Sequence, residues 1–196
     1  RGRNLDIVTQ SQTIDGFLTL KSDLWLLAYG LYILELVDSF TVENSANRPL
    51  FDLLLNALHW LSQADSNEVV LRYFELHLLH HLGYRPELYR CVKCNSPLKP
   101  VLNFFSSSQG GILCPNCGQK DFFSRSLSVD ALKILRLWQN CDYATARRVK
   151  LRSELSSELE QVLQEYIGYL LQRELKSIAW LEELRKMSLD NHGGED

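Results

Sequence analysis

The sequence lacks any hydrophobic run long enough to cross a membrane, and it lacks an export signal. A bilayer needs about 20 apolar residues, and stretches such as Leu24–Leu36 are broken by Glu35 and Asp38. The residues after Arg1 do not follow the order of a signal peptide. Disorder is also excluded, because 45% of the 196 residues are hydrophobic and 23% are charged. We therefore expect a globular protein of one or two domains.

Motifs of the common enzyme classes are missing as well. Gly110 and Gly111 have no following lysine or third glycine to hold a phosphate, and no serine lies in a nucleophile-elbow frame. His77 and His81 share a helix face, but a zincin needs glutamate directly after its first histidine, where Leu78 stands. Packing of His77 or His80 in a helix contact is the better interpretation, and we expect no enzyme.

β-branched residues are scarce, since 38 leucines stand against 17 valines and isoleucines, and this ratio favours helices over strands. Short, turn-rich links between the apolar segments are typical of antiparallel helices. The sequence therefore predicts a mainly α fold. Helices are expected after Ser22 and Asp23, from Pro49 to about Leu61, through Val70 to Leu82, over Val129–Trp138, from Asp142 to about Val149, and from Ser153 to about Met187.

The two ends of the chain differ from these helical segments. Residues 1–14 alternate polar and apolar side chains, which predicts a strand or two. A lone strand pair is barely stable, so this segment is expected to belong to a sheet that is largely missing from the chain. Residues 191–196 are predicted to be a disordered tail.

Four of the five cysteines form two pairs with metal-ligand spacing. Cys91 and Cys94 make the first pair, Cys114 and Cys117 the second, and 19 residues separate the pairs. This spacing is typical of a four-thiolate zinc site. Four protein ligands leave no open position, so zinc here would hold the fold together rather than activate water. Disulfides are the alternative, but they need an oxidising compartment.

The cysteine pairs lie in a segment of distinct composition. Residues 91–124 are rich in proline, glycine and serine, so helix is not expected. Asn103–Phe105 and Gly111–Leu113 flank a polar loop and predict a small β-hairpin. The fifth cysteine, Cys141, lies at a predicted helix end and is interpreted as a partly buried spectator thiol.

Positive charge is concentrated in the middle of the chain. The whole sequence has a net charge of -3, yet residues 91–152 carry ten basic and three acidic side chains. This segment is a plausible binding surface for a polyanion or an acidic peptide. The alternative is a solvated surface balanced by the acidic C-terminal helix.

Several segments together resemble a known family. They are Leu24–Asp38 with its Ala28-Tyr29 and Glu35-Leu36, then Leu71–Leu76, Leu82–Leu88, the two cysteine pairs with Gly110-Gly111 before the second, and Leu175-Lys176-Ser177. In this order they are similar to the RecO family of bacterial DNA-repair proteins, the recombination mediators of the RecF pathway. The resemblance covers nearly the whole chain.

The resemblance implies an N-terminal OB-fold, a helical domain and a zinc-bearing module. Only the last strand of an OB-fold would be present here, so the chain is expected to be a fragment with weakened DNA annealing. The implied divisions are 1–15 for the OB-fold remnant, 16–90 and 125–190 for the two parts of the helical domain, 91–124 for the zinc module and 191–196 for the tail.

The resemblance also implies three partners: single-stranded DNA, the RecR protein and the acidic, hydrophobic tail of single-stranded DNA-binding protein. It implies a location in the bacterial cytoplasm near the nucleoid, with no membrane contact. Arg72, just ahead of Phe74, is the candidate cation for the tail; the alternative is that Arg72 extends from a core helix to solvent. Candidate DNA contacts are Arg3, Arg147, Arg148, Lys150 and Arg152.

Two functions follow as hypotheses. The first is a non-enzymatic mediator that displaces single-stranded DNA-binding protein, loads recombinase and anneals strands. The second is a structural or adaptor helical domain with a zinc module that binds proteins alone. A zinc hydrolase is the weakest alternative, because it needs an open ligand position.

Overall fold

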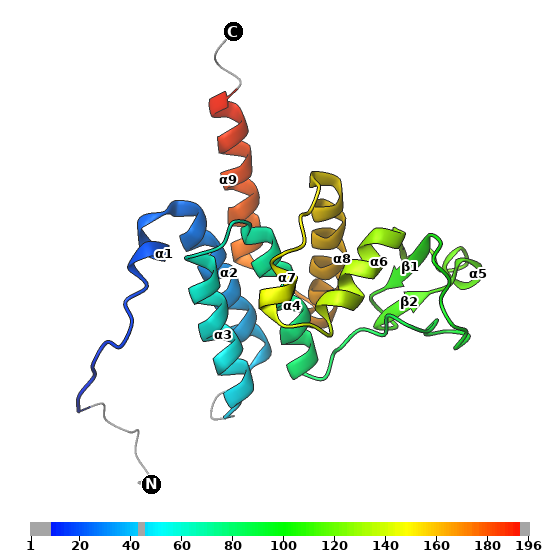
Figure 1. Cartoon of the computed structure of the whole chain (residues 1–196), viewed down its shortest axis with the longest axis horizontal. Coiled ribbons are helices and arrows are strands. Elements are labelled where there is room, and N and C mark those ends of the chain that lie inside the picture. The colour runs from blue at the N-terminus through cyan, green and yellow to red at the C-terminus, as the bar shows by residue number, and fades with distance from the viewer. Residues whose placement is uncertain (1–8, 43–45, 193–196) are drawn as a thin grey trace.

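The computed structural model describes residues 9–42 and 46–192, which are mainly helical (Figure 1). None of the helices in these residues combines the length and apolar character needed to cross a membrane. The helices are α1 (Leu18–Ser22), α2 (Leu24–Phe40), α3 (Arg48–Leu61), α4 (Asn67–His81), α5 (Pro115–Gly118), α6 (Val129–Trp138), α7 (Tyr143–Ala146), α8 (Ser153–Leu171) and α9 (Lys176–His192). The strands are β1 (Asn103–Ser106), β2 (Gly111–Leu113) and β3 (Arg125–Leu127).

Local capping explains where several helices begin. The side chain of Asp23 accepts a hydrogen bond from the backbone N–H of Leu26 at 2.9 Å, which starts α2. The expected marker Ser22 instead closes the short α1. At α3, Asn47 accepts from the N–H of Leu50 at 3.1 Å. Each cap satisfies a donor that the first helical turn leaves free.

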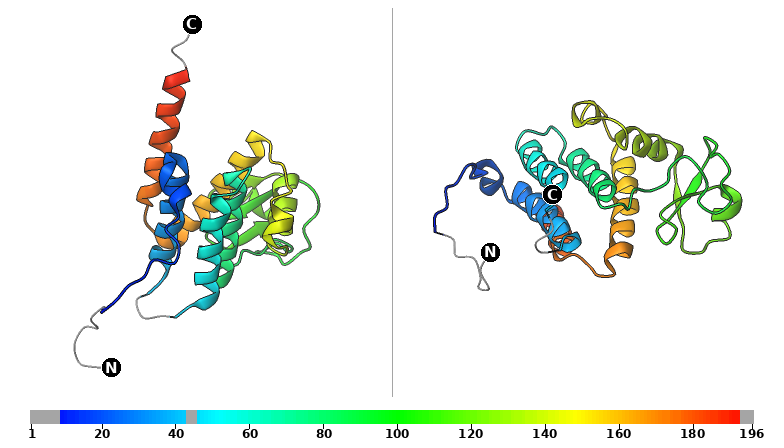
Figure 2. Two further views of the ribbon diagram at one scale, coloured as in Figure 1. Left: turned by 60° about the vertical axis from the view of Figure 1, so that its left-hand side comes forward. Right: turned by 90° about the horizontal axis from the view of Figure 1, so that it is seen from below.

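Helix α4 lies at the centre of the helical part. It packs against α2, α3 and α8, and Figure 2 shows α2, α3 and α4 side by side. Nearly every residue from Val69 to Leu79 is buried. Because α4 is covered all round, its sequence lacks the one-sided apolar stripe of a surface helix.

The C-terminal helix expected from Ser153 to Met187 is two helices. α8 ends at Leu171, and Gln172 adopts a left-handed conformation with a φ of 52°. The prediction was wrong because the cap of the next helix comes from α2. There Glu35 accepts hydrogen bonds from the backbone N–H of Lys176 at 3.0 Å and of Ser177 at 2.8 Å.

A three-stranded antiparallel sheet in the order β2-β1-β3 lies at one end of the long axis (Figure 1). The β1–β2 hairpin confirms the prediction, whereas β3 was not expected. The prediction that residues 91–124 contain no helix was wrong, because Pro115 opens the short helix α5 after Cys114. Phe104 is paired with Leu113 on one side and with Ser126 on the other. Phe105 is buried, and the centroid of its ring lies 5.3 Å from that of Tyr166 on α8. This ring contact fixes the sheet to the helices.

The ends of the chain differ from expectation in part. Residues 9–14 form no strand in the described structure, so the predicted N-terminal strand is absent there, and residues 1–8 lie outside the described residues. Asp15 instead contacts α3, with its carboxylate 2.9 Å from Nε2 of His59. α9 runs to His192, so the first two residues of the expected tail are helical, and 193–196 are outside the described residues.

The cap between α2 and α9 gives a test. We expect Glu35→Ala to lower the free energy of unfolding by about 1–2 kcal/mol, because two N–H groups at the start of α9 lose their acceptor. Burial raises the pKa of Glu35, but the hydroxyl and N–H of Ser177 and the N–H of Lys176 outweigh it, so the net shift is downward. The cap is therefore fully present above the ordinary glutamate pKa and is lost as pH falls through the lowered pKa.

Denaturant unfolding at neutral pH and at acidic pH measures this difference. Glu174→Ala is the matched control, since Glu174 is an exposed carboxylate in the same α8–α9 connection. It should change stability by less than about 0.5 kcal/mol. Equal losses for the two variants would contradict the assigned cap.

Candidate functional site

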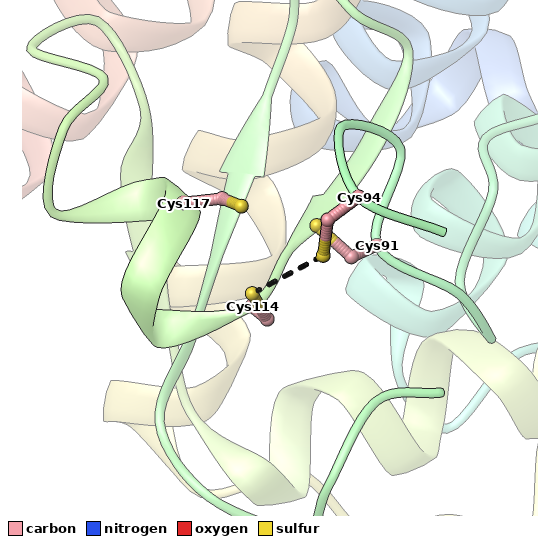
Figure 3. Close-up of side chains that lie close together, drawn as sticks. All are labelled: Cys91, Cys94, Cys114 and Cys117. Atoms are coloured by element: carbon pink, nitrogen blue, oxygen red, sulfur yellow. Dashed lines mark hydrogen bonds between the residues drawn. The ribbon is translucent and has the colours of Figure 1, made fainter. Parts of the chain in front are cut away.

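The four paired cysteines converge on one point (Figure 3). Their sulfur atoms all lie within 4.8 Å of one another, and the Sγ atoms of Cys94 and Cys114 are 3.8 Å apart. Tetrahedral Zn²⁺ with Zn–S bonds of about 2.3 Å places sulfurs about 3.8 Å apart. The five cysteines are free thiols. The donor set therefore fits a tetrahedral metal ion.

Tight backbone turns bring each pair of sulfurs together. In the first turn, the N–H of Cys91 donates to the carbonyl of Ser96 at 2.9 Å, and Asn95 donates to the carbonyl of Cys91 at 2.8 Å. Asn95 has a φ of 58°, a conformation that asparagine tolerates better than most residues. In the second turn, the N–H of Cys117 donates to the carbonyl of Cys114 at 3.0 Å.

The two turns are joined through the sheet. Val92, between the first two cysteines, donates its N–H to the carbonyl of Ile112 in β2 at 2.9 Å. Gly118 follows the last cysteine and lies directly on Phe104 of β1, where a Cβ atom would be only 2.3 Å from the ring. Glycine is needed here because the backbone approaches the ring so closely. The sheet thus sets the distance between the cysteine pairs.

The environments of the thiols differ. Hydrogen bonds from the hydroxyl and the N–H of Ser96 lower the pKa of Cys94 to about 6. Burial opposes ionisation of Cys91, but backbone N–H groups around its sulfur lower its pKa overall. Burial and the neighbouring thiols raise the pKa of Cys117 to about 12. A bound cation would draw the remaining protons off, since metal ligation requires thiolates.

Comparison with known proteins identifies the family. The family model for the C-terminal part of recombination protein O matches residues 21–179, which include all four paired cysteines. The chain belongs to the RecO family. A DNA repair protein RecO from Dehalococcoides mccartyi is 40% identical over 189 residues, covering 96% of this chain and 74% of the relative.

Two other RecO relatives show the same extent of similarity. One from Roseiflexus sp. is 38% identical over 186 residues, covering 95% of this chain and 66% of the relative. One from Bacillus pumilus is 32% identical over 183 residues, covering 93% of this chain and 71% of the relative. Each is named DNA repair protein RecO. The family resemblance found in the sequence is therefore confirmed.

In this RecO chain, the candidate peptide-binding residues lie inside the helical core. Phe74 is fully buried, and Arg72 is 2% exposed. Arg72 does not extend to solvent, because its Nη2 donates to Oε1 of Glu75 at 2.6 Å. Its Nη1 also lies 3.7 Å from Oε1 of Glu160 on α8. In this structure neither residue offers a surface to a partner.

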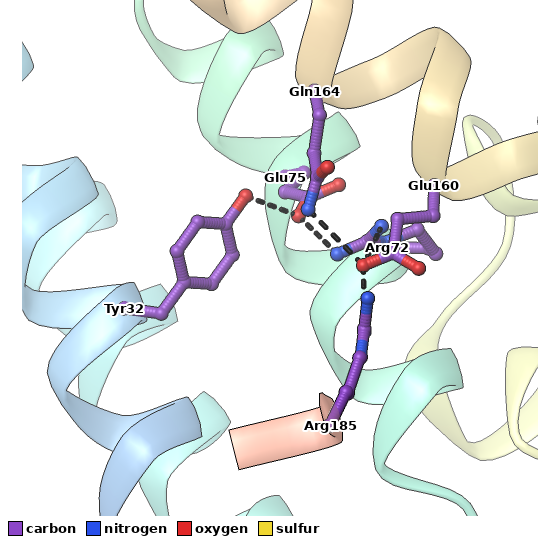
Figure 4. Close-up of polar contacts among 6 residues, drawn as sticks. All are labelled: Tyr32, Arg72, Glu75, Glu160, Gln164 and Arg185. Atoms are coloured by element: carbon purple, nitrogen blue, oxygen red, sulfur yellow. Dashed lines mark hydrogen bonds and ion pairs between the residues drawn. The ribbon is translucent and has the colours of Figure 1, made fainter. Parts of the chain in front are cut away.

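A buried polar network surrounds Arg72 (Figure 4). The hydroxyl of Tyr32 on α2 donates to Glu75 at 2.6 Å. Arg185 on α9 donates to Glu160 at 2.8 Å. The network thus joins α2, α4, α8 and α9. Sequence reasoning missed it, although an Arg-x-x-Glu pair inside an otherwise apolar helix was the available signal.

Burial controls the ionisation of this network. Desolvation raises the pKa of Glu75 to about 7 despite the adjacent guanidinium of Arg72 and the hydroxyl of Tyr32. It also raises the pKa of Tyr32 well above its usual range. Arg72 keeps its charge, because Glu75 and Glu160 raise its pKa overall against desolvation.

The candidate DNA contacts lie in the connection between α7 and α8. Arg147, Arg148, Lys150 and Arg152 are all exposed, while Arg3 lies outside the described residues. Between them Ala146 is buried and Val149 and Leu151 are partly buried. The alternation turns the apolar side chains inward and the basic side chains outward. We call these four basic residues the basic strip.

The remaining candidates have structural contacts. Nε2 of His77 lies 2.9 Å from the carbonyl oxygen of Trp138, and burial lowers the pKa of this histidine. The expected helix-contact role of His77 is thus confirmed. Cys141 is half-buried, its carbonyl accepts from the hydroxyl of Tyr73 at 3.0 Å, and burial raises the pKa of its thiol.

The cysteine cluster leads to a metal-dependence prediction. We expect Cys91→Ser with Cys114→Ser to abolish binding of one Zn²⁺ per chain and to unfold residues 91–124, because structural zinc contributes to folding. Metal analysis and near-ultraviolet circular dichroism measure these losses. The control variant Cys141→Ser changes a cysteine outside the cluster, so it should keep both its zinc content and its near-ultraviolet circular dichroism signal. Full zinc content in the double variant would contradict the four-thiolate site.

The buried pair leads to a stability prediction. Arg72→Met leaves Glu75 buried without its counter-charge, which should cost about 3–5 kcal/mol at pH 8. Glu75 has a folded pKa above its unfolded value, and removing Arg72 raises it further, so stability falls as pH rises from about 4.5 through that pKa. The loss should therefore be smaller at pH 5.

Chemical denaturation of the variant at both pH values measures this dependence. Arg48→Met is the matched control, since Arg48 forms an exposed ion pair with Asp52 at 2.9 Å on α3. It should cost less than about 1 kcal/mol at either pH. Similar losses in the free energy of unfolding for the two variants would contradict a stabilising buried pair between Arg72 and Glu75.

Proposed function

We propose that this chain acts as a non-enzymatic recombination mediator. In this role it binds single-stranded DNA, RecR and the tail of single-stranded DNA-binding protein, and it assists recombinase loading and strand annealing near the bacterial nucleoid. The family match over residues 21–179 carries the proposal. The relatives' name, DNA repair protein RecO, supports a role on DNA.

The basic strip supports contact with DNA. Its four cations lie on one short connection and are exposed together. The connection is anchored at α7, where the ring of Tyr143 stacks on Trp60 with centroids 4.0 Å apart. Because the backbone of this connection is anchored, binding a strand there costs little backbone conformational entropy. Neutralising phosphates releases counterions, so the affinity should fall as the salt concentration rises.

In this proposal a bound zinc ion would have a structural role. The four thiolates would complete the coordination shell of Zn²⁺, which then cross-links the two cysteine turns and supplies no open position for catalysis. The ring contact between Phe105 and Tyr166 of α8 holds the module against the helices. Arg136 of α6 donates to the carbonyl of Leu88, just before the module, and within the module Val92 donates to the carbonyl of Ile112.

A protein-only adaptor is the second candidate. It is favoured by partial neutralisation of the basic strip, since Arg147 lies 3.8 Å from Asp65 and Arg152 lies 4.0 Å from Asp130. A groove of about 480 Å³ in the zinc module also suits a peptide. Apolar side chains such as Leu98 line this groove, and Lys99 is the one lysine, with no arginine, aspartate or glutamate, among its lining residues.

Salt-dependent binding of a fluorescent oligothymidine to the whole chain tests the mediator. Replacing the basic strip by glutamine should lower the affinity and flatten the dependence of log K on log salt by about 0.7 for each phosphate that is no longer neutralised. The matched control removes four exposed cations elsewhere, with the substitutions Lys21→Gln, Arg48→Gln, Lys176→Gln and Lys186→Gln. It should retain most of the affinity.

An acidic peptide with an apolar terminus is the second probe in this experiment. A protein-only adaptor would bind the peptide and no strand at any salt concentration. A mediator would bind both. Equal reductions in affinity in the two glutamine variants would show that net charge, rather than the basic strip, governs strand binding.

A further inference from the structure

Two neighbouring phenylalanines, Phe122 and Phe123, stand almost entirely in solvent. Their exposed fractions are 96% and 88%, whereas the next most exposed aromatic side chain of the described residues, Phe51, is 55% exposed. They follow α5, which lies at the outer end of the long axis (Figure 1). Two adjacent aromatic rings that nothing else in the described structure covers need an explanation by function, because burying them would be favourable.

The loop that carries them is held in one conformation. Oδ1 of Asp121 accepts from the N–H of Phe123 at 3.1 Å, and Oδ2 accepts from the hydroxyl of Ser106 and the amide of Gln109, each at 3.2 Å. The hydroxyl of Ser124 closes the loop by donating to the carbonyl of Asp121 at 2.8 Å. Both oxygens of the one carboxylate in the loop are therefore occupied by the loop and the β1–β2 turn.

The surroundings of the two rings are polar and carry charges of both signs. Lys120 precedes the loop, is exposed, and takes part in none of the ion pairs found among the described residues. Arg125 follows it and is held on α8: its Nε donates to Glu165 at 2.6 Å and its Nη1 donates to Gln161 at 3.0 Å. Asp121 and Ser124 complete the sequence around the rings, so no aliphatic side chain adjoins them along the loop.

This combination distinguishes between two kinds of partner. The centre of a protein interface is depleted in charged residues, and an apolar docking patch is usually contiguous. An isolated aromatic pair between cations instead matches the surfaces that hold single strands, where bases stack on rings and phosphates meet lysine or arginine. Stacking accepts every base, so it requires no sequence-specific donors.

We propose that Phe122 and Phe123 form a stacking platform for unpaired bases of a single-stranded nucleic acid, with Lys120 as a phosphate contact. The proposal deepens the mediator function and rests on it. It assigns the zinc module a direct role on the strand. A fixed loop presents the rings already in place, so binding orders few groups.

Binding of oligothymidine to the whole, zinc-loaded chain tests the platform. Phe122→Ala with Phe123→Ala should weaken binding about tenfold, corresponding to the loss of about one stacked base. Phe122→Leu with Phe123→Leu should weaken it as much, since leucine retains apolar area but has no ring to stack. Phe122→Tyr with Phe123→Tyr should retain the affinity of the parent chain.

Two controls separate stacking from other causes. Phe51→Ala removes an exposed phenylalanine from α3 and should leave strand affinity unchanged. An abasic strand of equal length keeps its phosphates but has no bases, so it should bind the parent chain and the alanine variant equally. Because both rings are exposed, the variants should retain zinc and the helical circular dichroism of the parent.

The outcomes distinguish this proposal from the mediator function. Parent-like strand affinity in the alanine variant would overturn the platform, leave strand binding with the basic strip, and point to a protein contact for the two rings. Weaker binding in the alanine variant with parent-like binding in the leucine variant would also overturn stacking. A parent chain that binds no strand would overturn both proposals.

Discussion

The buried ion pair between Arg72 and Glu75 is the constraint on which the helical core depends. Both side chains lie on α4, the helix that is covered on every side, so neither can reach water. Burying charged groups is costly unless they are paired and hydrogen-bonded. The pair therefore requires Tyr32 from α2 and Glu160 from α8 at defined positions, and Glu160 in turn holds Arg185 of α9.

The four-cysteine module is joined to this core by contacts of a different kind. Phe105 and Tyr166 meet edge to face, and the hydroxyl of Tyr166 donates to the carbonyl of Tyr84 at 3.0 Å. These contacts fix the sheet on α8, while the cysteine cluster fixes the turns on the sheet. The module can thus project at one end of the molecule and still hold its outer loop in a defined place. The two proposed binding features lie apart: the basic strip beside α7 and the exposed rings beyond α5.

The features predicted correctly from the sequence depend on residues close together in the chain. Ser128 caps α6 through the N–H of Ala131, and Asp142 caps α7 through that of Thr145, each three residues away. The hairpin and the cysteine spacing are likewise short-range patterns. The break between α8 and α9 could not be predicted in this way, because its cap, Glu35, lies 141 residues from Lys176. The strand β3 was missed for the same reason, since three residues become a strand only by pairing with β1.

The sequence by itself determined the mainly helical class, the four-cysteine cluster and the RecO family. Composition, motif order and ligand spacing can be read from the chain directly and do not depend on which distant residues come into contact. Only the tertiary structure decided which charged and aromatic side chains reach solvent. Arg72 and Phe122 show this in opposite directions. An arginine expected to offer its charge to a partner is enclosed by the carboxylates of Glu75 and Glu160, whereas Phe122, for which the sequence made no prediction, is 96% exposed. Exposure depends on what packs against a residue, and that is a property of the whole fold.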